Sequence, residues 1–210
     1  LKALVCYRLI DPGSEFRFHR EWYVRSAIGD LLGEDYALAQ KDKAYRCLDM
    51  LLEHRDELFG FLKGQWGKLF EAKYDVLLYD LTSTYFESEP PPADAVSKKR
   101  FGYSRDKRSD CVQVVVALVL TPEGFPVAYE VYPGNTRDTA TLGEFLDRIE
   151  KQYGKFRRTW LMDRGIPTEE MLEKMRERGI DYLVGTPKGH LTRVEKPLLE
   201  KTWVEARENV

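Results

Sequence analysis

The stretch VQVVVALVL, residues Val112–Leu120, decides the fold class of this chain. Nearly all of its side chains are β-branched or otherwise apolar, which predicts a buried β-strand. The next residues, Thr121–Gly124, contain the proline and glycine of a tight turn, and Phe125–Tyr132 has the pattern of a partner strand. The sequence therefore predicts a β-hairpin in the middle of the chain.

Shorter apolar runs on both sides of the hairpin predict three further strands. One is Val76–Leu81, before the hairpin, and the others are Thr159–Asp163 and Asp181–Gly185, after it. Runs of this length and composition are typical of strands that are buried on both faces. We therefore expect a sheet that contains more than the hairpin.

Helical patterns separate the later strands. Thr139–Tyr153 places its large apolar side chains on a single helical face. Thr168 is a suitable N-cap for a second helix, and Gly179 can terminate it. The predicted order of strand, hairpin, helix, strand, helix and strand indicates an α/β domain.

The chain up to about Ala72 has a helical pattern throughout. One helix is expected to begin at Ser14, and Asp42 can cap another whose apolar residues recur at three- and four-residue spacing. We expect a helical subdomain over residues 1–72, serving as a DNA-binding, packing or dimerising module, and an α/β domain over residues 73–210.

Composition excludes several classes of protein. Basic and acidic residues are nearly balanced, at 33 and 35, and no apolar run approaches the roughly 18–20 residues that cross a bilayer. The three cysteines form no Cys-x-x-Cys pair, which argues against a disulfide framework or a thiolate zinc site. Glycine motifs for phosphates or dinucleotides are also absent. We expect a soluble intracellular protein without a membrane segment.

Two carboxylates, Asp80 and Asp163, end predicted strands and lie 83 positions apart. An aspartate at a strand end is often a turn or helix-cap residue. A mixed sheet can also bring two such strands together, and paired carboxylates then suit Mg²⁺ or Mn²⁺, which can support phosphoryl transfer. Both interpretations are open from these residues alone.

Four motifs accompany these acids in a fixed order. They are Asp80–Glu87, Arg100–Asp110, Pro133–Asp138 and Asp163–Gly165. Taken together, they make the sequence resemble insertion-sequence transposases with an Asp-Asp-Glu active site. In the branch concerned, the third acid lies in a Tyr-x-x-Arg-x-x-x-Glu-x-x-x-x-x-x-Lys signature.

The resemblance implies an RNase H-like mixed sheet with flanking helices, in which Asp80 and Asp163 are the first two catalytic acids and bind Mg²⁺ or Mn²⁺. Its implied activity is cleavage of a phosphodiester bond at a transposon end and transfer of the freed strand to target DNA. The implied partner is double-stranded DNA, with a homodimer as a further option. The implied location is the prokaryotic cytoplasm, in association with the nucleoid.

A basic loop is expected between the first strand and the hairpin, after a run of three prolines. Residues 97–108 hold six basic side chains and one acid. They are either a solvated loop or contacts to DNA phosphates. The six are Lys98, Lys99, Arg100, Arg105, Lys107 and Arg108.

The signature of the third acid is not found. Glutamates near the end of the sequence do not match it in context, and they are Glu195, Glu200, Glu205 and Glu208. We therefore expect a transposase fragment that lacks its third acid. Two alternatives are a non-catalytic DNA-binding or self-associating remnant and an unrelated metal-dependent phosphoesterase on the same fold.

Overall fold

The structure, a computed structural model, describes residues 1–33, 40, 42–92, 95–104, 106–155, 157–185, 195–196 and 199–202. The chain divides into two compact units, Leu1–Leu62 and Lys63–Val210. Each unit has its own buried apolar cluster, so each is described by itself.

The first unit is helical, as expected. Its described helices are short and surround a buried cluster of aromatic rings in which Tyr7 is fully enclosed and packs against Phe18 and Trp22. The helices are α1 (Lys2–Ile10), α2 (Glu15–Arg17), a π-helical turn (Phe18–Trp22), α3 (Tyr23–Arg25), α4 (Ile28–Leu32), α5 (Lys43–Glu53) and the start of α6 (Arg55–Phe70).

The two predicted N-caps of this unit behave differently. The Ser14 hydroxyl accepts a hydrogen bond from the backbone N–H of Arg17, which confirms the predicted helix start. Asp42 occupies the N-cap position of α5, but its side chain makes no capping hydrogen bond to the described part of the helix. Its backbone is already helical, whereas a capping side chain requires an extended N-cap.

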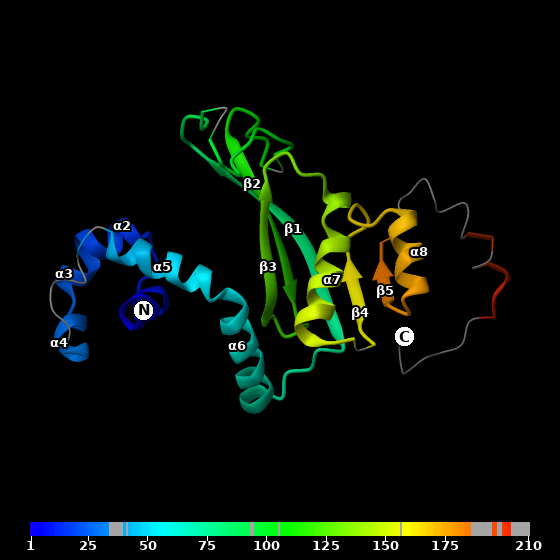
Figure 1. Ribbon diagram of the computed structural model, residues 1–210, viewed down its shortest axis with the longest axis horizontal. Helices are drawn as coiled ribbons and strands as arrows, with labels where there is room; N and C mark the ends of the chain where they lie inside the picture. Colours follow the sequence, from blue (N-terminus) through cyan, green and yellow to red (C-terminus); the bar gives the residue numbers. More distant parts are fainter. Residues whose placement is uncertain are drawn as a thin grey trace. The chain divides into compact units, whose positions relative to one another are not determined.

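The second unit is built on a five-stranded mixed sheet of order β3-β2-β1-β4-β5 (Figure 1). Strands β1, β2 and β3 pair antiparallel, and β1, β4 and β5 pair parallel. This arrangement confirms the predicted strand sequence and the RNase H-like mixed sheet. The strands are β1 (Val76–Phe86), β2 (Val112–Leu120), β3 (Pro126–Pro133), β4 (Thr159–Met162) and β5 (Asp181–Val184).

Helices α7 (Leu142–Tyr153) and α8 (Glu169–Glu177) connect to the parallel strands and share one buried cluster with the sheet. Both connections advance in the same direction across the sheet. Because such crossovers are right-handed, both helices lie on the same face. Figure 1 shows α7 running across the sheet. The predicted cap is confirmed, because Thr168 Oγ1 accepts a hydrogen bond from Met171 N.

Strand β1 alternates between two environments. Leu77, Tyr79 and Leu81 are buried beneath the helices, whereas Asp80 and Thr82 on the opposite face are exposed. The apolar residues of α7 complete the covered side of this core, and they are Leu142, Phe145, Leu146 and Ile149. Asp80 therefore projects from the face that α7 and α8 leave uncovered.

Replacement of Phe145 by alanine should destabilise the second unit. Phe145 is 1% exposed and its ring centre lies 5.3 Å from that of Tyr79, so truncation leaves a cavity under β1. We expect a loss of about 3–5 kcal/mol in the free energy of unfolding, measured by denaturant titration. Lys151→Ala on the exposed side of the same helix is the control, with an expected change within about 0.5 kcal/mol. Equal effects of the two substitutions would contradict the described packing of α7.

Candidate active site

The parallel pairing of β1 with β4 brings the two predicted acids together. The last pair in the register is Tyr79 with Met162, and Asp80 and Asp163 are the next residues of the two strands. Both carboxylates are exposed, and neither forms an ion pair with a described residue. Asp163 Oδ1 accepts a hydrogen bond of 2.7 Å from the backbone N–H of Arg164, which orients this side chain at the strand end.

A buried contact fixes the position of Asp80. The hydroxyl of the preceding residue, Tyr79, donates a hydrogen bond of 2.8 Å to Thr141 Oγ1 at the start of α7. The Tyr79 ring also packs against Phe145 and Trp160. Strand β1 is thus attached at this point to the helix and to β4, and the backbone of Asp80 is held from both sides.

The donor set at this point suits a hard divalent cation. Two neighbouring carboxylates repel each other unless a proton or a cation lies between them. Oxygen ligands of this kind are the ones that Mg²⁺ and Mn²⁺ prefer. The described residues contain no group of three or more histidine, cysteine, aspartate or glutamate side chains that could hold a metal ion. Asp80 and Asp163 therefore belong to no such group within the described part of the chain.

The late glutamates do not complete the set. Glu195 and Glu200 are exposed and belong to no metal-binding group of the described residues. Glu205 and Glu208 lie outside the described residues. The third acid is accordingly not assigned to any residue.

The basic segment is attached to the hairpin. Arg100 and Gln113 exchange backbone hydrogen bonds of 3.0 and 2.9 Å, and Gly134 N donates to Lys98 O. The Lys98 ammonium group donates to Val131 O, and the Lys99 ammonium group lies 4.1 Å from the centre of the Phe86 ring. The described part of the segment is thus bonded to the sheet and is not the free loop that the preceding prolines predict.

The charges of this segment are partly neutralised. Arg108 forms ion pairs with Glu87 at 2.7 Å and Asp110 at 2.9 Å. These hydrogen bonds raise the pKa of Arg108, and the Arg108 bond lowers the pKa of Asp110 to about 2. Lys107 is exposed and makes no ion pair with the described residues, and Arg105 lies outside them.

Two glycines let the basic segment approach the turn after β3. A Cβ atom on Gly102 would lie 1.9 Å from Gly134 O, and one on Gly134 would lie 2.1 Å from Gln113 O. The Gln113 side chain, 1% exposed, joins the two segments because its Nε2 donates to Tyr103 O and to Gly134 O. The sequence gives one signal for this contact, a lone amide in the apolar run of β2.

Comparison with known proteins decides the family. Residues 71–207, about two thirds of the chain, match the model of the transposase DDE domain. The chain belongs to this family. The matched region contains both acids, the basic segment and the two glycines. No curated protein gives a significant match.

Several solved transposase and integrase assemblies resemble this transposase-family chain weakly. The Mos1 transposase paired-end complex with left transposon end has 12% identity and a TM-score of 0.38, over 99% of this chain and 67% of that one. The piggyBac transposase synaptic complex with hairpin DNA has 13% identity and a TM-score of 0.39. The match covers 63% of this chain and 26% of that one. The simian T-cell lymphotropic virus intasome with PP2A regulatory subunit B56 gamma has 13% identity and a TM-score of 0.33. The match covers 60% of this chain and 40% of that one.

The search for membrane segments gives a negative result. Among the helices that the structure describes, none combines the length and the apolar character needed to cross a bilayer. This agrees with the absence of a long apolar run in the sequence.

Replacement of Gly134 by alanine should disturb the contact between the basic segment and the β3 turn. The new methyl group would meet the backbone oxygens of Gln113 and Arg100, which cannot move without breaking their pairing. We expect a loss of about 1–3 kcal/mol in the free energy of unfolding, measured by denaturant titration.

Gly67→Ala in α6 is the matched control, because a Cβ at that position meets no atom within 4 Å. Alanine there should be neutral or stabilise the helix by up to about 1 kcal/mol. If Gly134→Ala were as harmless as Gly67→Ala, the close approach of the two segments would be wrong.

Proposed function

We propose that this transposase-family chain acts in metal-dependent cleavage and strand transfer of DNA, with Asp80 and Asp163 as the catalytic metal ligands. The observation that carries the proposal is the β1–β4 register, which makes these two residues neighbours at the end of a rigid parallel pair. Membership of the transposase DDE domain family supports this reaction class. The carboxylates of Asp80 and Asp163 are both exposed, so DNA and solvent water can reach them.

Each residue of the pair has a distinct structural support for this role. Asp80 follows Tyr79, which anchors β1 to α7, and Asp163 is oriented by the Arg164 backbone. Both would hold Mg²⁺ or Mn²⁺ through carboxylate oxygens. A bound divalent ion supplies charge neutralisation at the phosphate and lowers the pKa of a coordinated water.

We further propose that the basic segment contacts the phosphates of double-stranded DNA. The segment lies against β2 and the end of β3, and β2 pairs directly with β1, the strand that carries Asp80. Lysine and arginine side chains at such a place neutralise phosphates without reading the sequence. Lys107 is the clearest candidate, because it is exposed and has no acidic partner among the described residues.

Substitution of either acid by asparagine should weaken metal binding. Asparagine keeps the shape of the side chain but removes the negative charge that attracts the cation. We expect Asp80→Asn and Asp163→Asn each to weaken Mn²⁺ binding at least about tenfold, a cost of about 1.4 kcal/mol. The measurement is electron paramagnetic resonance of free Mn²⁺ during titration. Mg²⁺- or Mn²⁺-dependent nicking of supercoiled plasmid DNA provides a second readout.

Asp75→Asn is the matched control, because this exposed carboxylate lies immediately before β1, five residues before Asp80 in the sequence. It should leave Mn²⁺ binding unchanged. Unaltered Mn²⁺ binding in both site variants would overturn the proposed metal site. DNA binding without any metal-dependent nicking would favour the non-catalytic remnant over the enzyme.

Neutralisation of Lys107 should weaken DNA binding in a salt-dependent manner. The loss of one phosphate contact should reduce the slope of log K against log salt concentration by about 0.9. The measurement is fluorescence anisotropy of a labelled duplex with Lys107→Gln over a salt series. Lys155→Gln, which removes an exposed lysine after α7, is the control. Equal slopes for the two variants would contradict a phosphate contact by Lys107.

A further inference from the structure

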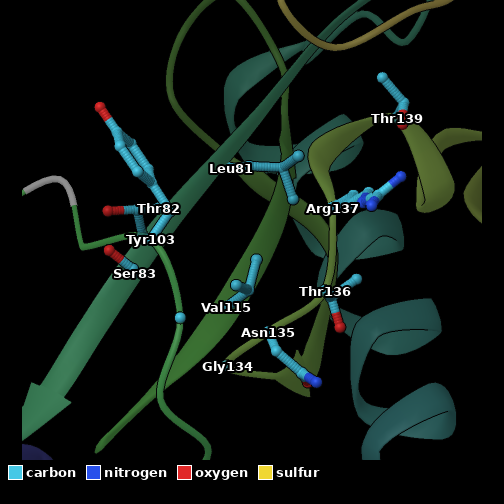
Figure 2. Close-up of a pocket in the computed structure, with 11 residues that line it drawn as sticks. Leu81, Thr82, Ser83, Tyr103, Val115, Gly134, Asn135, Thr136, Arg137 and Thr139 are labelled. Atoms are coloured by element: carbon cyan, nitrogen blue, oxygen red, sulfur yellow. The ribbon is translucent and has the colours of Figure 1, made fainter. Parts of the chain in front are cut away.

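A pocket of about 410 Å³ lies beside β1, immediately beyond Asp80 in the strand (Figure 2). Its floor is apolar and consists of Leu81 and Val115, which are 1% and 6% exposed. In the view of Figure 2 these two residues lie between Tyr103 on one side and Arg137 on the other. The volume falls within the usual range for small-molecule and cofactor sites.

The two sides of the pocket come from segments already joined to each other. Tyr103 follows Gly102 in the basic segment, and Asn135 follows Gly134 after β3. The Gln113 amide bridges Tyr103 O and Gly134 O and so fixes the distance between the two walls. The pocket is therefore preformed by the glycine contact and does not depend on the conformation of an isolated loop.

The walls carry polar groups that the protein itself does not use. The Arg137 guanidinium forms no ion pair with the described side chains. The hydroxyl of Ser83, which lines the pocket and is shielded from solvent, has no hydrogen-bond partner among the described residues. Unpaired buried polar atoms are rare in folded proteins and call for an explanation such as a bound water or ligand.

The aromatic ring of Tyr103 is the most unusual feature of the rim. This side chain is 88% exposed, although a tyrosine ring gains free energy when it is buried. Its backbone oxygen is held by Gln113, so the ring stands on a fixed support at the mouth of the pocket. An exposed aromatic ring whose backbone is held at the edge of an apolar floor can serve as a stacking platform for a planar ring.

We propose that this pocket binds one unpaired nucleotide of a DNA strand, with its base between Tyr103 and the apolar floor and its phosphate near Arg137. The proposal rests on the proposed function, since it takes DNA as the substrate. A nucleotide fits all three chemical features of the pocket, because it combines a planar ring, an anionic phosphate and base edges that an amide such as Asn135 can bond.

The pocket also lies close to the two acids, where the proposed DNA strand would be cut. Strand β4 ends at Met162, so its pairing with β1 stops at Tyr79, the residue before Asp80. Asp80 projects to the uncovered face, while the next residue, Leu81, faces the pocket floor. A DNA strand cut at the two acids can therefore place an adjacent nucleotide at the pocket, which begins one residue further along β1.

The test is binding of a single-stranded oligonucleotide that contains 2-aminopurine, measured by fluorescence in the presence of EDTA. Tyr103→Ala should weaken binding about tenfold, as expected for the loss of one base–aromatic stack. Tyr103→Phe should retain the affinity within about twofold, because it keeps the ring. Arg137→Gln should weaken binding about fivefold and reduce its salt dependence.

Lys151→Gln at the far end of α7 is the control for Arg137→Gln and should bind like the original chain. The free energy of unfolding should be the same for all four variants, since the altered side chains are exposed. Equal binding by Tyr103→Ala and Tyr103→Phe, or no binding by the original chain, would overturn the pocket assignment.

The metal-site variants separate this proposal from the proposed function. Asp80→Asn should bind the oligonucleotide normally in EDTA, because its carboxylate projects from the opposite face of the sheet. Loss of Mn²⁺ binding in Asp80→Asn together with normal oligonucleotide binding in Tyr103→Ala would refute the pocket alone. Unchanged Mn²⁺ binding in Asp80→Asn together with weakened oligonucleotide binding in Tyr103→Ala would refute the metal site and support the nucleotide pocket.

Discussion

The parallel register of β1 with β4 is the constraint on which the candidate site depends. Only four residue pairs define it, from Val76 with Thr159 to Tyr79 with Met162. A slip of one residue would turn either aspartate toward the helices, where an unpaired carboxylate is costly to bury. The register is held by large side chains on the covered face, since Tyr79 packs against both Trp160 and Phe145. The exposed acids are thus positioned by the buried core.

The early end of β4 has two consequences for the same stretch of β1. Asp80 and Asp163 lie just beyond the last β1–β4 pair, and the pocket begins at the next residue of β1, Leu81. The antiparallel partner β2 continues to pair with β1 as far as Phe86, so the strand remains straight and supported. A strand supported by β2 can present the proposed metal ligand Asp80 on one face and a pocket wall on the other.

The sequence predicts the local features of this site and misses those that depend on distant contacts. Apolar runs locate all five strands, and the two acids stand out because charged residues rarely end such runs. The extension of β1 to Phe86 is missed, because polar residues alternate there with partly buried ones. The contact of Gly102 with Gly134 has no periodic pattern, since its partners are 32 positions apart and meet only in the folded sheet.

The number of basic residues near the site does not show how many of them can bind a phosphate, because some already form ion pairs. Six basic residues in the segment suggest a uniform basic loop, yet Arg108 is neutralised by Glu87 and Asp110 and Lys98 lies 3.6 Å from Glu130. Arg137 belongs to no basic cluster in the sequence, but it lines the pocket without an acidic partner among the described residues. A cation that is already paired has less attraction left for a phosphate. Arg137 is therefore better placed to hold an anion than Arg108, the most heavily bonded arginine of the basic segment.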